Sequence, residues 1–191
     1  VEEAIQQGSR DAPRDKSSDE RSVTMRYVET NPPAFAARTA HAQAGPDGKW
    51  AVELAPATAS FQPTWIIAKS GGRTLAVDEV LVGEVWVASG QSNMAWPLNR
   101  SNRPRKGVRR PRPSRIRLFT VPRTAIDVPQ ADVQATWTSA EDSKALARFS
   151  AVAYFFACEI GQETGTAVGM INTSWGGTAI LPWTPVAGSP E

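Results

Sequence analysis

The chain has 191 residues, of which 41% are hydrophobic and 21% charged, and this composition is typical of a globular protein. Its formal net charge of +2 is too small to indicate a partner, and its single cysteine excludes an intrachain disulfide without fixing a compartment. That cysteine, Cys158, stands in an apolar helical pattern and is expected to be a buried structural thiol. No apolar run approaches the roughly 18 residues that span a bilayer, so no membrane association is expected.

The first part of the chain predicts a tail followed by a small antiparallel β unit. Residues 1–22 are polar and charged, and we expect them to be disordered because they offer almost nothing to bury. Residues 23–82 contain short strand-like runs separated by turns. A Pro-Asp-Gly turn is expected to join strands at 37–43 and 50–55, and the two glycines within 69–73 predict a hairpin.

The pattern changes at Gly83. The run 83–89, Gly-Glu-Val-Trp-Val-Ala-Ser, is apolar on both faces, as expected for a parallel strand that is covered on both sides. Further strands are predicted at 115–121 and 166–174, with one amphipathic helix over 144–162 between them. Strands that alternate with helices predict an α/β sheet, in which ligand sites lie beyond the carboxyl ends of the strands.

Two turns follow the carboxyl ends of predicted strands, Ser-Gly-Gln-Ser-Asn-Met at 89–94 and Ser-Trp-Gly-Gly-Thr at 174–178. In the first turn, Gly90 allows a tight bend and Ser92 is expected at the start of a helix, where free backbone N–H groups can stabilise an oxyanion. A serine held in this way is either a nucleophile or a helix N-cap, and the N-cap is the commoner case for one turn taken alone. In the second turn, paired glycines either let the backbone approach a ligand or serve a tight turn.

Taken together, these stretches resemble two blocks of the sialate O-acetylesterase family of SGNH-type hydrolases. The stretch 83–98 resembles the first block, in which the serine of Gly-Gln-Ser-Asn-Met is the nucleophile. The stretch 167–183 resembles the second block, which contains Trp-Gly-Gly-Thr. The segments between them stand in the family's order, and 48–56 resembles its accessory β domain. The resemblance extends from about Gly45 to Trp183.

The resemblance implies a flavodoxin-like three-layer α/β domain that removes O-acetyl groups from sugars, typically sialic acid, without a metal or other cofactor. Ser92 would attack the acetyl carbonyl, and the N–H groups of Ser92 and of Gly177 or Gly176 would hold the oxyanion. Nearby loop side chains would shape the crevice for the acetylated sugar, although packing is the commoner role for either tryptophan: Gln91, Asn93, Trp96, Trp175 and Thr178. The resemblance also suggests an exported or periplasmic protein, although this chain contains no signal-peptide core.

The resemblance is incomplete. The family's later blocks, Gln-Gly-Glu-x-Asn and the Asp-x-x-His that supplies the general base, are not present in these residues. The sole histidine, His41, lies in the β unit and is expected to be a surface or turn residue. The sequence therefore predicts that 83–191 is the N-terminal half of an SGNH-type domain with little or no esterase activity. Ala95, where the family often has glutamate, and Ile-Leu-Pro-Trp in place of a frequent Ile-Glu-Ala-Trp leave the substrate preference open.

Two other functions are considered. A chain that keeps the crevice and lacks the base could be a non-catalytic carbohydrate-binding protein. The basic run from Arg100 to Arg117 could bind phosphates, but it has no interleaved aromatic residues and no recognition helix, so a solvated loop is favoured and no nucleic-acid partner is expected. The Asn-Thr-Ser sequence at Asn172 lies at a predicted strand end, and we expect it to be inaccessible to glycosylation. The sequence indicates no oligomeric state.

Overall fold

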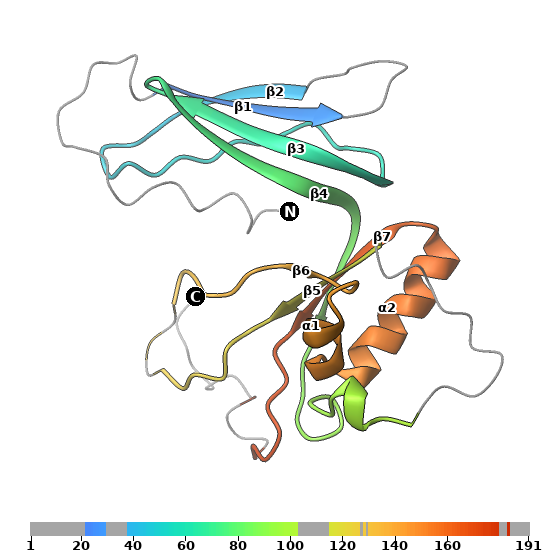
Figure 1. The fold of residues 1–191 in the computed structure, drawn as a ribbon. Coiled ribbons are helices and arrows are strands. Elements are labelled where there is room, and N and C mark those ends of the chain that lie inside the picture. Colours follow the sequence, from blue (N-terminus) through green and yellow to red (C-terminus); the bar gives the residue numbers. More distant parts are fainter. Residues whose placement is uncertain are drawn as a thin grey trace. The chain divides into compact units, whose positions relative to one another are not determined.

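The computed structural model describes residues 22–29, 38–102, 115–126, 128, 130–179 and 183. Its elements are, in order, β1 (Ser22–Glu29), β2 (Arg38–Gln43), β3 (Ser60–Ser70), β4 (Arg73–Ala88), η3 (Leu98–Arg100), β5 (Ile116–Thr120), β6 (Thr138–Ser139), α1 (Ser143–Arg148), α2 (Ala151–Thr164) and β7 (Ala167–Asn172) (Figure 1). The chain divides into two compact units, Val1–Val82 and Gly83–Glu191. The predicted disordered tail, except for Ser22 at the start of β1, and most of the basic run lie outside the described residues.

The first unit is an antiparallel sheet, as the sequence predicts. β1 lies between β2 and β3, and β3 pairs with β4 as far as Val82. Gly71 and Gly72 connect β3 to β4 with φ angles of 51° and 75°. Two consecutive residues with positive φ form the kind of tight turn that matches the twist of a β-hairpin, so the predicted hairpin is confirmed.

The strand predicted over 50–55 is wrong. Val52 and Leu54 are half-buried and their neighbours are exposed, so the alternation that suggested a strand is real. Within the described ranges, however, no strand pairs with this segment, and both edges of β1 are already occupied by β2 and β3. Alternation alone therefore did not distinguish a packed loop from a strand. His41 is exposed on β2, where its Nδ1 lies 3.1 Å from Thr24 Oγ1, which confirms the expected surface position.

The second unit contains the predicted parallel sheet. The last part of β4 pairs in parallel with β7, from Gly83 opposite Ala167 to Ala88 opposite Asn172, and β5 pairs in parallel with the other edge of β7. The short β6 adds an antiparallel edge to β5. Because the three parallel strands end together, the segments that follow β4 and β7 leave from the same end of the sheet.

The helix predicted over 144–162 is two helices, α1 and α2. Phe149 between them is extended, with φ −72° and ψ 157°. Ser150 begins α2, because its Oγ accepts a hydrogen bond from Ala153 N at 3.1 Å. The backbone of Ser150 also forms a β-bridge with Pro97, a contact between distant parts of the sequence that a helical pattern does not reveal. Gly165 ends α2 with φ 65°.

The two helices and one face of the sheet enclose the core of the second unit. The buried side chains include Ile116 and Leu118 of β5 and Val168 and Met170 of β7. These four side chains point to the same face, because their residues are paired in register and alternate along the strands. The described residues thus form two layers, helices and sheet, of the three that an SGNH-type domain is expected to have. No helix in the described part of the chain is long and apolar enough to cross a membrane.

Cys158 lies on α2 within this core, which confirms the buried thiol. Burial, as the largest cause, raises its thiol pKa from 9.0 to about 11, while a hydrogen bond with Tyr154 opposes the rise. Because the thiolate is the nucleophilic form, the folded protein holds its cysteine in an unreactive state at neutral pH.

We expect Cys158 to resist iodoacetamide at pH 8 in the folded chain and to react rapidly in urea. Since the folded-state pKa is above the unfolded value, the protonated thiol stabilises the fold below about pH 9, and this contribution is lost as the pH rises toward 11. Urea titrations at pH 8, 9 and 10 should therefore show a steeper fall in the free energy of unfolding for the native chain than for Cys158→Ala. If the free energy of unfolding falls equally with pH in both chains, folding does not raise the pKa of the Cys158 thiol.

Candidate active site

The turn that carries Ser92 begins where β4 ends. Gly90 has φ 133°, a conformation that side chains rarely adopt, and it redirects the chain out of the sheet. Ala95 N then donates to Gln91 O at 2.8 Å, which closes one helical turn around Ser92. Ser92 itself is exposed.

The expectation that Ser92 starts a helix is only partly met, because the helix ends after this one turn. Pro97 has no N–H to continue the hydrogen-bond pattern, and it disfavours helical geometry in the residue before it. The chain instead packs against the start of α2, where Leu98 N donates to Phe149 O and Ala151 N donates to Trp96 O, both at 2.9 Å. These bonds attach the residues that follow the turn to the start of α2.

The side chain of Gln91 accepts hydrogen bonds from both donors of Ser92, its hydroxyl and its backbone N–H. Its Oε1 accepts hydrogen bonds from Ser92 Oγ at 2.8 Å and from Ser92 N at 3.2 Å. The Gln91 oxygen therefore occupies a position close to both the hydroxyl and the backbone N–H of the serine. An acetyl carbonyl oxygen that used the same N–H would have to displace it.

The second turn is fastened to the first by backbone hydrogen bonds. Thr173 N donates to Ala88 O and Trp175 N donates to Gly90 O, each at 2.9 Å. The chain after β7 thus follows the chain after β4 beyond the end of the sheet. Both turns leave the same end of the sheet, as the sequence predicts.

Gly176 lies directly beside Ser92. A Cβ atom built on Gly176 would be 3.7 Å from Ser92 Cα and 3.7 Å from the Ala95 Cβ. Gly177 follows with φ 84°, which a residue with a side chain would adopt only with strain. Ala95, which belongs to the first turn, therefore also borders the second turn.

Two buried residues that the sequence analysis did not assign to the site hold the second turn in shape. Asn172, the last residue of β7, accepts hydrogen bonds at its Oδ1 from Ser174 N at 3.1 Å and from Ser174 Oγ at 2.6 Å. Arg123 adds a bond from its Nε to Ser174 O at 3.4 Å. An asparagine two residues before a serine at a strand end was the available signal, since asparagine often bonds the backbone two residues on. The burial of Asn172 also confirms that its Asn-Thr-Ser sequence is inaccessible.

The remaining crevice candidates lie around the two turns. Trp96 is 51% exposed and its Nε1 donates to Arg100 O, so the packing role favoured for this tryptophan is wrong. Trp175 is half-buried, and its carbonyl accepts a hydrogen bond from Thr178 Oγ1 at 2.8 Å. Asn93 is exposed, and its carbonyl accepts the N–H of Trp96.

The second unit contains no histidine, because His41 is the only one in the chain. The described side chains also include no group of three or more His, Cys, Asp or Glu placed to hold a metal ion. The second unit therefore presents a serine hydroxyl and backbone donors, and it has no imidazole to take the serine proton.

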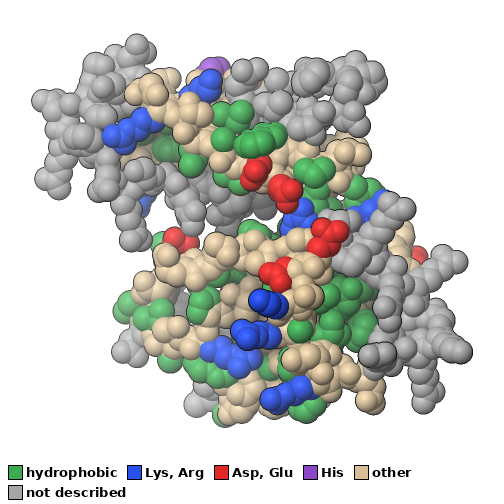
Figure 2. All heavy atoms as spheres, viewed as in Figure 1, with side chains coloured by type: hydrophobic (Ala, Val, Ile, Leu, Met, Phe, Trp, Pro, Cys, Tyr) green, Lys and Arg blue, Asp and Glu red, His purple; other side chains and the backbone are tan. Residues whose placement is uncertain are grey.

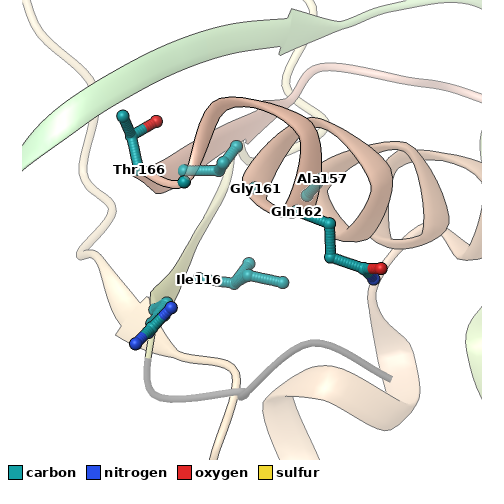
Figure 3. Close-up of a pocket in the computed structure, with 8 residues that line it drawn as sticks. Ile116, Ala157, Gly161, Gln162 and Thr166 are labelled. Carbon is teal, nitrogen blue, oxygen red and sulfur yellow. The ribbon is translucent and has the colours of Figure 1, made fainter. Parts of the chain in front are cut away.

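A small cavity of about 220 Å³ lies at the opposite end of the sheet. It is lined at the start of β5 by Arg115 and Ile116 and near the end of α2 by Gly161 and Gln162 (Figure 3). Ser92 and Gly176 follow the carboxyl ends of the strands, whereas this cavity lies at the amino ends, so it is not part of the candidate site.

A serine-bearing turn and a glycine-rich turn lie side by side at the carboxyl ends of parallel strands, which is consistent with an incomplete SGNH-like α/β domain. The structure is similar to that of a carbohydrate acetylesterase from Xanthomonas citri, with a TM-score of 0.73 and 33% identity, covering 90% of this chain and 37% of that one. The chain matches no family model.

Two curated relatives are sialate O-acetylesterases. The chain is 29% identical over 151 residues to the sialate O-acetylesterase of Rattus norvegicus, covering 73% of this chain and 28% of the relative. It is 33% identical over 119 residues to the sialate O-acetylesterase of Pongo abelii, covering 58% and 23%. The chain is thus similar to sialate O-acetylesterases, and it spans less than a third of the length of these two curated relatives.

Proposed function

We propose that this chain supplies the nucleophile-bearing part of an esterase that removes O-acetyl groups from carbohydrate, sialic acid or a similar sugar. The observation that carries the proposal is the position of Gly176 against Ser92, because it sets a glycine-rich backbone beside an exposed serine hydroxyl. The names of the relatives, sialate O-acetylesterase and carbohydrate acetylesterase, support the substrate class.

In the proposed reaction, Ser92 Oγ attacks the acetyl carbonyl carbon while a base takes the hydroxyl proton. The carbonyl oxygen becomes an oxyanion, which the N–H groups of Ser92 and of Gly176 or Gly177 would stabilise. The sugar oxygen leaves with a proton, and water then hydrolyses the acetyl-serine. Gln91 would release Ser92 when substrate enters, since its Oε1 now accepts both serine donors.

The base is the part that the second unit does not provide. A general base contributes about 10²–10⁴-fold to a rate, so we expect the 191-residue chain to hydrolyse acetyl esters weakly. The lack of a histidine in the second unit also favours a second candidate function, a non-catalytic carbohydrate-binding protein. The two functions differ in whether Ser92 is chemically activated when a base is supplied.

We expect imidazole to accelerate fluorophosphonate labelling of Ser92 at least about tenfold, because it replaces the missing base. Labelled peptides are identified by mass spectrometry in the native chain, in Ser92→Ala and in Ser89→Ala, an exposed serine of the same turn that serves as the control. Label at Ser92, lost only in Ser92→Ala, would support a nucleophile. Label spread over surface serines at rates independent of imidazole would contradict it, and binding of acetylated sialic acid by such a chain would favour the non-catalytic function.

A further inference from the structure

The side-chain oxygen of Gln91 lies where the proposed site would receive the acyl oxygen of an ester. In the proposed reaction that acyl oxygen accepts the N–H of Ser92, and in the structure the same N–H donates to Gln91 Oε1 at 3.2 Å. The Ser92 hydroxyl donates to the same atom at 2.8 Å, so its proton is held by a weakly basic amide oxygen. One side-chain atom thus engages both groups of the serine that the reaction uses.

The second turn provides donors that Gln91 leaves unused. Among the described residues, the backbone N–H groups of Gly176 and Gly177 have no hydrogen-bond acceptor. A Cβ atom built on Gly176 would lie 3.7 Å from Ser92 Cα, so this glycine backbone is beside the serine. An acyl oxygen that enters between the two turns can accept from Ser92 and from a glycine together, whereas both hydrogen bonds of Gln91 Oε1 come from Ser92. A ligand oxygen therefore has more donors available than the glutamine oxygen that it displaces.

The charges around the two turns favour an anionic oxygen over a neutral one. The described segments directly after the three parallel strands are 89–102, 121–126 and 173–179. They contain two charged residues, Arg100 after β4 and Arg123 after β5, and Arg123 is bonded to the second turn through Ser174 O. Figure 2 shows basic but no acidic side chains among the described residues at this end of the visible face of the second unit. An oxyanion or a carboxylate therefore interacts more favourably with this region than a neutral amide oxygen does.

The side chain of Gln91 is free to leave without disturbing the turn. Gln91 is exposed, and its backbone carbonyl accepts the N–H of Ala95 at 2.8 Å, which holds the helical turn independently of the side chain. Exposed side chains change rotamer within picoseconds to nanoseconds, which is fast compared with enzymatic turnover. Rotation about the side-chain bonds of Gln91 is therefore enough to uncover Ser92.

We infer that Gln91 is a gating residue, whose side-chain oxygen keeps Ser92 unreactive until the acyl oxygen of a bound ester displaces it. The gate opens most favourably for an oxygen that carries negative charge and accepts from both turns, which is what the attacked carbonyl oxygen becomes. A molecule that places no such oxygen between the turns leaves Ser92 bonded to Gln91. The inference rests on the proposed function for the role of Ser92 as the nucleophile.

Acetate tests the gate without requiring the serine to react, because a carboxylate oxygen competes with Gln91 Oε1 for the Ser92 N–H. Its binding is measured by NMR titration of the Ser92 and Gly177 amide signals. Gln91→Met has a similar length and no such acceptor, and it should bind acetate about tenfold more tightly, since one hydrogen bond changes an equilibrium roughly two- to twelvefold. Gln91→Glu keeps an acceptor and adds a negative charge, so it should bind acetate more weakly than the native chain. Gln134→Met, which changes an exposed glutamine elsewhere in the second unit, is the control and should leave the affinity unchanged.

Imidazole-assisted fluorophosphonate labelling of Ser92 is the second readout, and it should be about fivefold faster in Gln91→Met, because both serine donors are released. Acetate that shifts neither amide signal, or that binds Gln91→Met and the native chain equally, would overturn the inference. Slower labelling in Gln91→Met would also overturn it, because Gln91 would then orient Ser92 for attack. Tighter acetate binding without label at Ser92 in any chain would contradict the proposed function and support the competition between Gln91 and a ligand oxygen.

Discussion

Gly83→Ala is expected to destabilise the second unit by about 3 kcal/mol, at the upper end of the range for overpacked positions. A Cβ atom at this position would lie 2.0 Å from Ala167 O and 2.7 Å from Ala167 C, and both are backbone atoms of the neighbouring strand. A side chain that rotates away could relieve a smaller clash, but a strand backbone can yield only if β4 and β7 separate. The variant should therefore weaken the parallel pairing that positions both turns.

The prediction is tested by urea unfolding followed through the tryptophan fluorescence of the chain, and by amide exchange in β7. Gly161→Ala is a matched control, since a Cβ there would meet only ordinary contacts at 3.4 and 3.5 Å and would remove a helix-disfavouring glycine from α2. Its stability should be unchanged or slightly increased. If Gly83→Ala unfolds at the same urea concentration as the native chain, the close approach of the two strands is not real.

The elements that the sequence predicted best are the parallel strands and the turns that follow them. The run Gly83–Ala88 pairs in parallel with β7 as predicted, but the expectation that it is covered on both sides is wrong for the described residues, because only Ala88 of this run is buried. The turns at Ser92 and Gly176 follow strand ends because glycine permits the sharp change of direction. The order of these features along the chain was enough to indicate that the two turns meet. The structure adds the hydrogen bonds that hold them together.

The features that sequence reasoning missed depend on contacts between distant residues. The division of one predicted helix into α1 and α2 follows from the bridge between Pro97 and Ser150, which no local periodicity records. The roles of Asn172 and Ser174 depend on their burial beside the turn, whereas their residue types alone also suit an exposed loop. The strand predicted at 50–55 failed for the same reason, because pairing partners decide whether an alternating segment joins a sheet.

The proposed active site needs a serine held beside a glycine-rich turn, and it also needs a base that accepts the serine proton. The second unit carries the serine and holds a glycine-rich turn beside it through the backbone hydrogen bonds of Thr173 and Trp175, while Asn172 shapes that turn, so this geometry is built within one unit. The second unit contains no histidine that could act as the base. Substitutions in the second turn can therefore be tested in the 191-residue chain, because the second unit already holds this turn beside Ser92.

Asn172→Ala is expected to lower the free energy of unfolding by about 3 kcal/mol and to slow imidazole-assisted labelling of Ser92 by about a hundredfold. Its Oδ1 is the acceptor for both Ser174 N and Ser174 Oγ, and Asn172 and Ser174 are buried. A buried donor left without a partner costs about 1–3 kcal/mol, and alanine would leave two. The turn would then relax, moving Gly176 away from Ser92, and loss of one oxyanion donor typically costs about 10²–10³-fold.

Ser174→Ala separates the two hydrogen bonds to Asn172 Oδ1, one from the backbone N–H of Ser174 and one from its hydroxyl. It keeps the hydrogen bond from the backbone N–H at position 174 to Asn172 Oδ1 and removes only the hydroxyl bond, so a loss of about 1 kcal/mol and little change in labelling are expected. Exchange of the Trp175 amide, which donates to Gly90 O, reports the attachment of the two turns directly and should accelerate in Asn172→Ala alone. If both variants lose the same stability and label Ser92 at the native rate, Asn172 serves the packing of β7 and does not position the second turn.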